Sequence, residues 1–426
     1  MYLIDKLDNG IRVVMEDIPY VNSVSIGVII DTGSIKEDKL NYGISHFIEH
    51  MLFKGTNKRT AKNIAESIDN IGGQLNAFTG KESTCFYAKV LYNHYDIALD
   101  VLSDMLCNSV FAEEEIEKEK SVILEEINMY LDLPEDLASE TLNELMFNNT
   151  SLGHPILGTE NSIKDINRDK IVEYFHTNYI PENIVISVAG KLNTKEILKE
   201  LNYYFGRLNN TNKLHNQNII INNSYSFTNK LKGIYKDTEQ LNLCIGMEGV
   251  SYLSNQMEAL LVLNNVVGGS MSSRLFQKIR EELAIAYIIE SFPSPFKDIG
   301  VFNMYVGLDS TQILKTLDYI AMEINDIKKN LITKEELAKS KEQLKGSYVL
   351  GMEGTFSRMY EIGKSLSIYN IVESPAEVLE KIEKVNIEDI YNLVNIVFNK
   401  EKVNIAYVGE LPEKDSTEEK IKNILF

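Results

Sequence analysis

Cysteine is scarce in this chain of 426 residues. The three that occur, Cys85, Cys107 and Cys244, are an odd number and lack the paired C-x-x-C spacing of a thiolate metal cage. The sequence therefore indicates neither a disulfide framework nor a site with cysteine ligands. We expect the three thiols to be reduced and mostly buried, as in a protein of a reducing compartment.

Long hydrophobic runs and an excess of positive charge are also lacking. No apolar stretch approaches the roughly 18 residues of a membrane span, and residues 1–8 do not resemble a signal peptide. We therefore predict a cytoplasmic protein. Lysine and arginine number 43 against 62 acidic residues, which gives a net charge of -19. This charge opposes binding to nucleic acid or to anionic membranes and favours cationic partners, such as basic peptides.

Glycine and proline are not in excess, which excludes a fibrous chain. Hydrophobic residues make up 44% and charged residues 25%, so a mainly disordered chain is excluded as well. At roughly 150 residues per domain, the length allows two or three domains with substantial cores. The composition is that of an ordinary globular protein.

Two segments of the chain resemble each other at a constant offset. Residues 165–192 align with residues 384–411 without a gap, and Gly190 and Gly409 lie 219 positions apart. Each copy has the pattern of an amphipathic helix, a polar loop and an apolar strand that ends in glycine. We therefore predict a duplicated α+β fold.

The domain boundaries are predicted from the composition between the two copies. Residues 209–218 are rich in asparagine, which is typical of turns and solvated loops. We place a linker at 209–224, between a first half at 1–208 and a second half at 225–426. Each half should be a sheet covered by helices. Strands are expected at 83–90 and 300–307, and helices at 113–130 and 334–350.

The most specific motif is the segment His46-Phe47-Ile48-Glu49-His50. Apolar residues recur at helical spacing through residues 44–52, and His46, Glu49 and His50 fall within a sector of about 100° beside them. Two imidazoles one turn apart can chelate one metal, and the carboxylate between them can deprotonate a metal-bound water. The order H-x-x-E-H is the inverted form of the zincin helix. The alternative is a chance occurrence on a solvated helix face without metal.

A catalytic zinc site needs a third protein ligand. The acidic run at 113–127 has a helical pattern, and most of its carboxylates would form a solvated face. Glu119 and Glu126 are seven residues apart, within about 20° of one helix face, which they share with Val122 and Ile123. We expect both carboxylates to point inward, where a cation would offset the cost of their burial.

On these residues the chain resembles the pitrilysin/insulinase-type inverzincin metallopeptidases, most closely their short branch similar to the mitochondrial processing peptidase. The resemblance implies that Glu126, 76 residues after His50, is the third zinc ligand and that Glu119 supports the catalytic site. It also implies that Gly72–Thr79 forms a Gly-Gly turn and an edge strand, along which a substrate peptide pairs as an added strand. Asn76 would contact this peptide or the site.

The resemblance extends into the second half of the chain. Residues 268–287 resemble the family segment whose arginine and tyrosine, seven residues apart, grip the substrate near the scissile bond. These correspond to Arg280 and Tyr287, which taken alone would be a surface ion-pair residue and a core aromatic. Ala284 stands where the family usually has glycine, so the loop geometry depends on whether this turn needs a positive φ. His154 stands where a family loop commonly has arginine, and we interpret it as structural.

Only the first half of the chain can bind metal, because Val262 and Val266 occupy the positions that correspond to His46 and His50. The resemblance therefore implies a zinc endopeptidase of peptides or unfolded segments. His46, His50 and Glu126 would bind Zn²⁺, Glu49 would be the general base, and Arg280 and Tyr287 would hold the substrate carbonyl and the developing oxyanion. Cobalt or manganese is not excluded by these ligands.

Longer members of the family resemble two such chains fused, so a homodimer is expected from a chain of this length. A noncatalytic peptide-binding or scaffold subunit is the alternative function, since the family includes members kept for assembly. Those members typically lose a ligand or the base, and this chain retains all of them. A structural zinc protein is disfavoured, because only three ligands are found.

Overall fold

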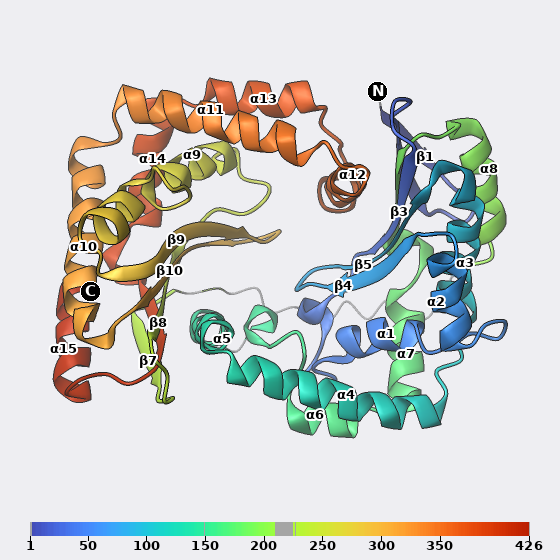
Figure 1. Ribbon diagram of the computed structural model, residues 1–426, viewed down its shortest axis with the longest axis horizontal. Helices are drawn as coiled ribbons and strands as arrows, with labels where there is room; N and C mark the ends of the chain where they lie inside the picture. Colours follow the sequence, from blue (N-terminus) through green and yellow to red (C-terminus); the bar gives the residue numbers. More distant parts are fainter. Residues whose placement is uncertain (1, 149, 209–224, 226, 426) are drawn as a thin grey trace. The chain divides into compact units, whose positions relative to one another are not determined.

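The computed structural model describes residues 2–148, 150–208, 225 and 227–425 (Figure 1). The chain forms two compact units, and each unit contains one mixed β-sheet packed with helices. The predicted α+β class is confirmed. Unit 1 comprises Met1–Ile127, His154–Ile221 and Val349–Ser374, and unit 2 comprises Asn128–Gly153, Asn222–Tyr348 and Pro375–Phe426.

Unit 1 contains a six-stranded sheet in the order β1-β2-β6-β3-β5-β4. The strands are β1 (Tyr2–Lys6), β2 (Arg12–Asp17), β6 (Ile184–Gly190), β3 (Ser23–Ile30), β5 (Thr84–Leu91) and β4 (Gln74–Thr79). Strands β2 and β6 pair in parallel, and the other neighbours are antiparallel. The central strands β3 and β6 are apolar almost throughout and buried, as expected for strands that are covered on both faces.

Helices cover both faces of this sheet. On one face, α1 (Ile44–Leu52), α3 (Tyr95–Asn108), α7 (Arg168–Asn178) and α8 (Thr194–Phe205) enclose the main core of the unit. On the other face, α12 (Thr355–Tyr369) packs Ile362 and Leu366 against Val14, Ile29 and Val185.

The sheet accepts α12 closely because a glycine lies at the contact. A Cβ atom on Gly27 would lie 2.2 Å from the sulfur of Met359, so only glycine leaves room for that side chain. The hydroxyl of Ser187 donates a hydrogen bond of 2.6 Å to the main-chain oxygen of Met359. Arg358 forms an ion pair with the buried Glu16. Packing and polar contacts thus both fix α12 on the sheet of unit 1.

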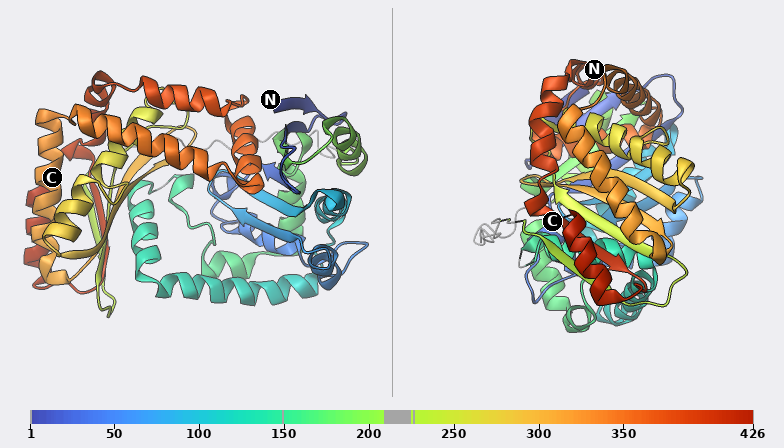
Figure 2. Two further views of the ribbon diagram at one scale, coloured as in Figure 1. Left: turned by 45° about the horizontal axis from the view of Figure 1, so that its top comes forward. Right: turned by 90° about the vertical axis from the view of Figure 1, so that its left-hand side faces the viewer.

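Unit 2 contains a five-stranded sheet in the order β7-β11-β8-β10-β9. The strands are β7 (Lys230–Ile234), β11 (Asn404–Val408), β8 (Leu241–Glu248), β10 (Gly300–Leu308) and β9 (Ala286–Pro295). Again one pair, β7 and β11, is parallel and the other neighbours are antiparallel. The core of the unit lies between this sheet and helices that include α9 (Met257–Val267), α10 (Ile313–Asn330), α14 (Ile387–Val397) and α15 (Lys414–Leu425), which Figure 2 shows in yellow, orange and red.

The opposite face of the second sheet is covered by α5 (Pro134–Met146). A Cβ atom on Gly246 would lie 2.3 Å from the sulfur of Met146, and Lys230 donates a hydrogen bond of 2.9 Å to the main-chain oxygen of Leu145. α5 therefore covers the second sheet as α12 covers the first. Each helix belongs by sequence to the half of the chain that supplies the other sheet.

The internal repeat is also visible in the secondary structure. Helices α7 and α14 begin at Arg168 and Ile387, which are 219 positions apart, and each precedes an interior strand of its sheet, β6 or β11. The strands and helices expected within the halves are present as β5, β10, α4 (Glu113–Asp132) and α11 (Lys334–Gly351). The linker predicted at 209–224 lies outside the described residues. The boundaries at 208 and 225 stay a prediction. The compact units divide the chain differently, because α5 belongs to unit 2 and α12 belongs to unit 1.

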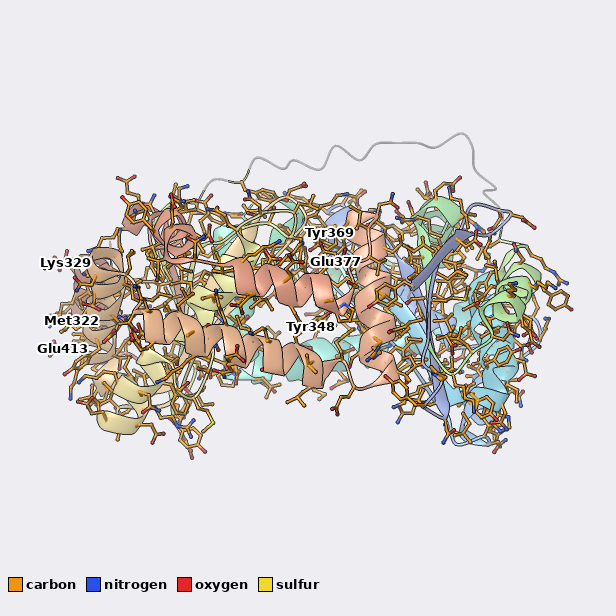
Figure 3. The ribbon with its side chains drawn as sticks, turned by 90° about the horizontal axis from the view of Figure 1, so that it is seen from above. Met322, Lys329, Tyr348, Tyr369, Glu377 and Glu413 are labelled. Carbon is orange, nitrogen blue, oxygen red and sulfur yellow. The ribbon has the colours of Figure 1, made fainter. Side chains whose placement is uncertain are left out.

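Exposed side chains on α10 include Met322 and Lys329 (Figure 3). Cys85 and Cys244 are buried and Cys107 is half-buried, and none of the three forms a disulfide. Among the described residues, every helix is too short or too polar to cross a bilayer.

Candidate metal centre

The N-terminus of helix α1 is held by a buried carboxylate from outside the helix. Gly43 precedes the helix with a φ of 88° and offers no capping side chain. Instead, the carboxylate oxygens of Glu37 accept hydrogen bonds from the main-chain N–H groups of Gly43 and Ser45, at 2.7 and 2.9 Å. Burial raises the pKa of Glu37 to about 7, although these two hydrogen bonds favour its ionised form. Glu37 thus fixes the first turn of the helix that carries the histidines.

His46, His50 and Glu126 converge in unit 1. The Nε2 atoms of His46 and His50 lie 3.8 and 3.7 Å from the same oxygen of Glu126, Oε2. One ligand atom from each of the three residues lies within 4.8 Å of the others. Burial, and then the neighbouring His50, lower the pKa of His46 to about 3, so its imidazole is neutral and can act as a ligand.

The donor set fits zinc. Separations of 3.7 and 3.8 Å are too long for hydrogen bonds between these atoms. They approach the distance of about 3.4 Å between two ligand atoms that surround a tetrahedral zinc ion at about 2.1 Å. Two imidazoles and one carboxylate leave a fourth position open, as in catalytic zinc sites.

Glu119 supports this centre through His50. Its carboxylate is 3% exposed, with one oxygen 2.7 Å from His50 Nδ1 and the other 2.6 Å from Lys54 Nζ. Burial opposes the ionisation of Glu119, but the hydrogen bonds with His50 and Lys54 outweigh it and lower the pKa of the carboxyl group. An ionised Glu119 accepts the Nδ1 proton of His50 and leaves the Nε2 lone pair free for a metal.

The acidic face of α4 differs in part from the prediction. Glu119 and Ile123 are buried as expected, but Val122 is 49% exposed and the side chain of Glu126 is 33% exposed. The prediction that Val122 shares the buried face is therefore wrong. Glu119 and Ile123 are four residues apart and define the buried stripe, whereas Val122 and Glu126 form the adjoining stripe at its edge.

Glu49 lies between the two histidines on α1. Burial raises the pKa of its carboxyl group, and a hydrogen bond from Thr79 acts in the opposite direction. The hydroxyl of Thr79 donates this bond to Glu49 Oε2 over 2.6 Å. No pattern in the sequence assigns a role to Thr79, although it is the last residue of the predicted edge strand.

That edge strand is β4, which ends the six-stranded sheet and pairs with β5 on one side only. Gly72 has a φ of 68°, which explains the glycine in the preceding turn. Asn76 is exposed on β4, and its side-chain oxygen accepts the main-chain N–H of Ala77. Contact of Asn76 with a peptide stays a prediction.

Arg280 and Tyr287 lie together in unit 2. Arg280 is on a π-helix, Phe276–Glu282, and its guanidinium carbon lies 4.7 Å from the ring centre of Phe276 and 5.6 Å from that of Tyr287. Tyr287 is 67% exposed, which contradicts the alternative of a core aromatic. Both side chains are therefore accessible to a ligand, and their role in substrate binding stays a prediction.

The turn between them adopts the conformation that favours glycine. Ala284 has a φ of 51°, in the left-handed region. The substitution of alanine for the family glycine thus leaves a strained residue, not a different turn.

His154, Val262 and Val266 have packing roles and do not bind metal. The His154 ring centre lies 3.7 Å from that of Tyr42, and the main-chain oxygen of His154 accepts a hydrogen bond from Lys81. Burial lowers the pKa of His154 to about 4, which supports a neutral packing role. Val262 and Val266 are buried in α9.

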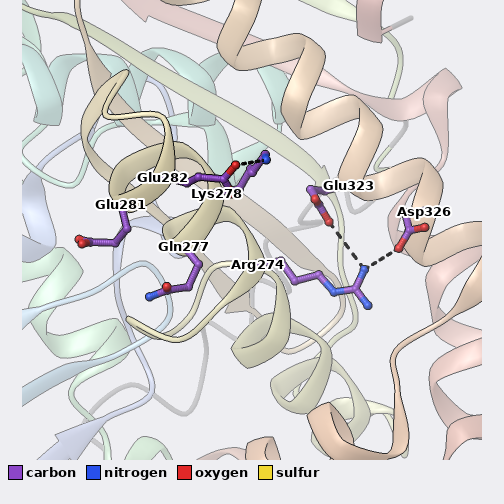
Figure 4. Close-up of a pocket in the computed structure, with 7 residues that line it drawn as sticks. All are labelled: Arg274, Gln277, Lys278, Glu281, Glu282, Glu323 and Asp326. Atoms are coloured by element: carbon purple, nitrogen blue, oxygen red, sulfur yellow. Dashed lines mark hydrogen bonds and ion pairs between the residues drawn. The ribbon is translucent and has the colours of Figure 1, made fainter.

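A pocket of about 620 Å³ lies elsewhere in unit 2, beside Arg274 (Figure 4). Arg274 lies just before the π-helix and points toward Glu323 and Asp326, with which it forms ion pairs. Both carboxylate oxygens of Glu336 accept hydrogen bonds from its guanidinium, at 2.7 and 2.9 Å. These carboxylates already neutralise the arginine, so the pocket resembles a structural ion-pair network more than a binding site.

Comparison with known proteins gives matches along nearly the whole chain. The family description "Insulinase (Peptidase family M16)" matches residues 12–160, and "Peptidase M16 inactive domain" matches residues 165–344. A protein of Bacillus subtilis named uncharacterized zinc protease YmxG is 42% identical, over 92% of this chain and 95% of that protein. An uncharacterized zinc protease of Rickettsia bellii is 38% identical, over 93% of this chain and 95% of that protein.

Two solved structures have the same fold. A protease from Helicobacter pylori matches with a TM-score of 0.87 at 20% identity, over 96% of this chain and 99% of the other. A peptidase M16 inactive domain from Pseudomonas fluorescens matches with a TM-score of 0.86 at 18% identity, over 96% of this chain and 98% of the other.

Proposed function

We propose that this chain, which belongs to the insulinase family of M16 peptidases, is a zinc-dependent endopeptidase that cleaves peptides or unfolded segments. The observation that carries the proposal is the convergence of His46, His50 and Glu126, with Glu49 one position before the second histidine. The relatives named zinc proteases support the same reading.

Each residue of the centre has a distinct task in this mechanism. His46, His50 and Glu126 would hold the metal, and Glu119 would keep the Nε2 atom of His50 free to bind it. When bound, zinc would supply Lewis acidity that polarises a peptide carbonyl and lowers the pKa of water. Glu49 would take a proton from the attacking water and deliver it to the leaving amine.

Arg280 and Tyr287 would hold the carbonyl region of the substrate. The guanidinium of Arg280 and the exposed hydroxyl-bearing ring of Tyr287 lie close enough to act on one ligand. Donors placed where negative charge develops stabilise a transition state more than a ground state. Val262 and Val266 of the second half are buried and cannot bind metal, which is consistent with a substrate-binding task for this half.

The decisive experiment separates metal binding from catalysis. We expect Glu49→Gln to retain zinc and the fold but to lose hydrolysis of an unstructured peptide, because a base is removed and no ligand. His50→Ala should lose the metal as well. Bound metal is measured by atomic absorption, and cleavage by mass spectrometry of the products. Stoichiometric zinc in His50→Ala would contradict the ligand assignment, and a zinc-loaded wild-type protein that cleaves no peptide would favour a noncatalytic peptide-binding subunit.

Basic peptides are the proposed substrate class, because the net charge of the chain is -19. Electrostatic attraction raises the local concentration of cationic ligands and weakens as salt screens it. Peptides rich in lysine and arginine should therefore be cut faster than acidic peptides of equal length, with a preference that shrinks at high ionic strength. A preference independent of salt would contradict this part of the proposal.

A further inference from the structure

The side chain of Glu49 accepts one hydrogen bond in the described part of the chain, and its donor is the hydroxyl of Thr79 at 2.6 Å. The two residues come from different elements. Glu49 lies on α1, and Thr79 is the last residue of β4, the free edge of the sheet. α1 packs against β4 in unit 1 (Figure 1).

Strand geometry explains why Thr79 reaches the helix. Successive side chains of a strand point to opposite faces, so Leu75, Ala77 and Thr79 share one face of β4. Leu75 and Ala77 pack against the core cluster that contains Phe47 of α1. Phe78 points to the other face and packs on Tyr360 of α12. The register of β4 therefore aims the hydroxyl of Thr79 at α1.

A general base needs one carboxylate oxygen that is free and correctly aimed. Glutamate rotates about three bonds, so an unheld carboxylate samples many orientations. The hydrogen bond from Thr79 occupies Oε2 and leaves Oε1 for the proton that the base must take. Because the donor is anchored in a strand, the orientation is imposed by the sheet.

We propose that Thr79 is a positioning residue for Glu49 and that it links the base to the edge strand along which a substrate peptide would pair. The inference rests on the proposed peptidase function, because it assigns Glu49 as the base. Thr79 touches none of the three metal ligands in the contacts described, so its contribution should fall on turnover and not on metal binding.

Thr79→Val is the central test, since valine keeps the shape and strand preference of threonine and removes the hydroxyl. We expect roughly a 10- to 100-fold lower kcat, as for loss of a hydrogen bond to a charged group. KM should change less than about twofold, and zinc content and melting temperature should match the wild type. Thr79→Ser should recover most of the activity. Thr177→Val is the matched control, because its hydroxyl donates only to the main-chain oxygen of Glu173 on α7.

A second comparison tests whether Thr79 acts through Glu49. In Glu49→Asp the carboxylate is one methylene shorter and cannot keep the same bond, so adding Thr79→Val should lower kcat by less than about threefold further. The proposal is overturned if Thr79→Val has wild-type kcat, if Thr79→Ser is as impaired as Thr79→Val, or if the variant loses zinc. It is also overturned if the two substitutions act additively. If the zinc-loaded wild type cleaves nothing, the peptidase function itself fails, and the role of Thr79 fails with it.

Discussion

Lys54 lies four residues after His50 and binds the oxygen of Glu119 that His50 does not use. A carboxylate that is 3% exposed needs a compensating charge, and the ammonium of Lys54 supplies it. In this way Lys54 acts on His50 through Glu119. Histidines that bind zinc generally donate their other ring N–H to a carboxylate, a main-chain carbonyl or water.

We expect Lys54→Met to weaken zinc binding by about 10-fold, because Glu119 loses a hydrogen bond that favours its ionised form and then accepts the Nδ1 proton of His50 less strongly. Competition with a chromogenic chelator measures the affinity. Lys54→Arg should retain it, and Lys58→Met is a control on an exposed lysine that approaches Asp104 instead. Equal zinc affinity in Lys54→Met and wild type would show that the ion pair is not needed.

Glu37 gives a prediction about pH. Burial raises the pKa of its carboxyl group from the ordinary value of 4.5 to about 7. Between these two values the folded chain holds more protons at this site than the unfolded chain, so stability falls as the pH rises. The contribution over the window is about 3 kcal/mol in the free energy of unfolding.

Glu37→Gln removes this titration. Relative to the variant, the wild type should lose stability between pH 4.5 and pH 7.5, as measured by urea unfolding at both values. A difference between the two proteins that does not change with pH would contradict the assignment of a raised pKa to this buried cap.

At the scale of elements, the loop before β9 carries strain in a single residue. Ala284 has a φ of 51°, a conformation that costs an L-residue roughly 1–2 kcal/mol. Glycine avoids this cost but loses roughly 0.5–1 kcal/mol more conformational freedom on folding. The balance favours glycine by up to about 1.5 kcal/mol.

We therefore expect Ala284→Gly to raise the thermal stability of the protein slightly, as measured by calorimetry. Ala321→Gly in the middle of α10 is the matched control and should lower stability by roughly 0.5–1 kcal/mol, because helix interiors disfavour glycine. A loss of stability in both variants would show that the left-handed turn costs this alanine less than glycine loses in conformational freedom.

The exchanged helices α5 and α12 cover the sheets of unit 2 and unit 1. The helices that precede them in the chain, α4 and α11, each have residues in both units. α4 carries Glu126 within the last two residues of its first-unit segment, Met1–Ile127. The third candidate ligand therefore lies near the point at which α4 passes from the first unit to the second.

At the scale of the whole molecule, the resemblance predicts that two copies associate about a two-fold axis, with each zinc facing Arg280 and Tyr287 of the other copy. A homodimer of this symmetry is also the commonest oligomer. The alternative is a monomer whose second half serves its own metal.

Mixing two inactive variants decides between these arrangements. Glu49→Gln chains contribute an intact Arg280, and Arg280→Ala chains contribute an intact metal centre. After subunit exchange at equal input, about half of the dimers are mixed and each has one intact composite site, so about a quarter of the wild-type activity should return. If exchange is demonstrated and the mixture is no more active than the sum of its parts, the shared site is wrong.

The sequence by itself determined the features that depend on local spacing. His46 and His50 lie on one helix face because they are one turn apart. The internal repeat can be recognised in the sequence because α7 and α14 begin 219 positions apart. The α+β class followed from the same periodicities. Glu126 came from the resemblance, since helical spacing alone gives several acidic candidates on α4.

Only the tertiary structure decided the contacts between residues far apart in the chain. Thr79 meets Glu49 across 30 positions, and Lys54 meets Glu119 across 65 positions. Val122 is exposed although its helix face looked buried, because the neighbours that cover a helix are not encoded in its own periodicity. The exchange of α5 and α12 has the same cause, since an apolar helix face specifies that it must be covered but not which sheet will cover it.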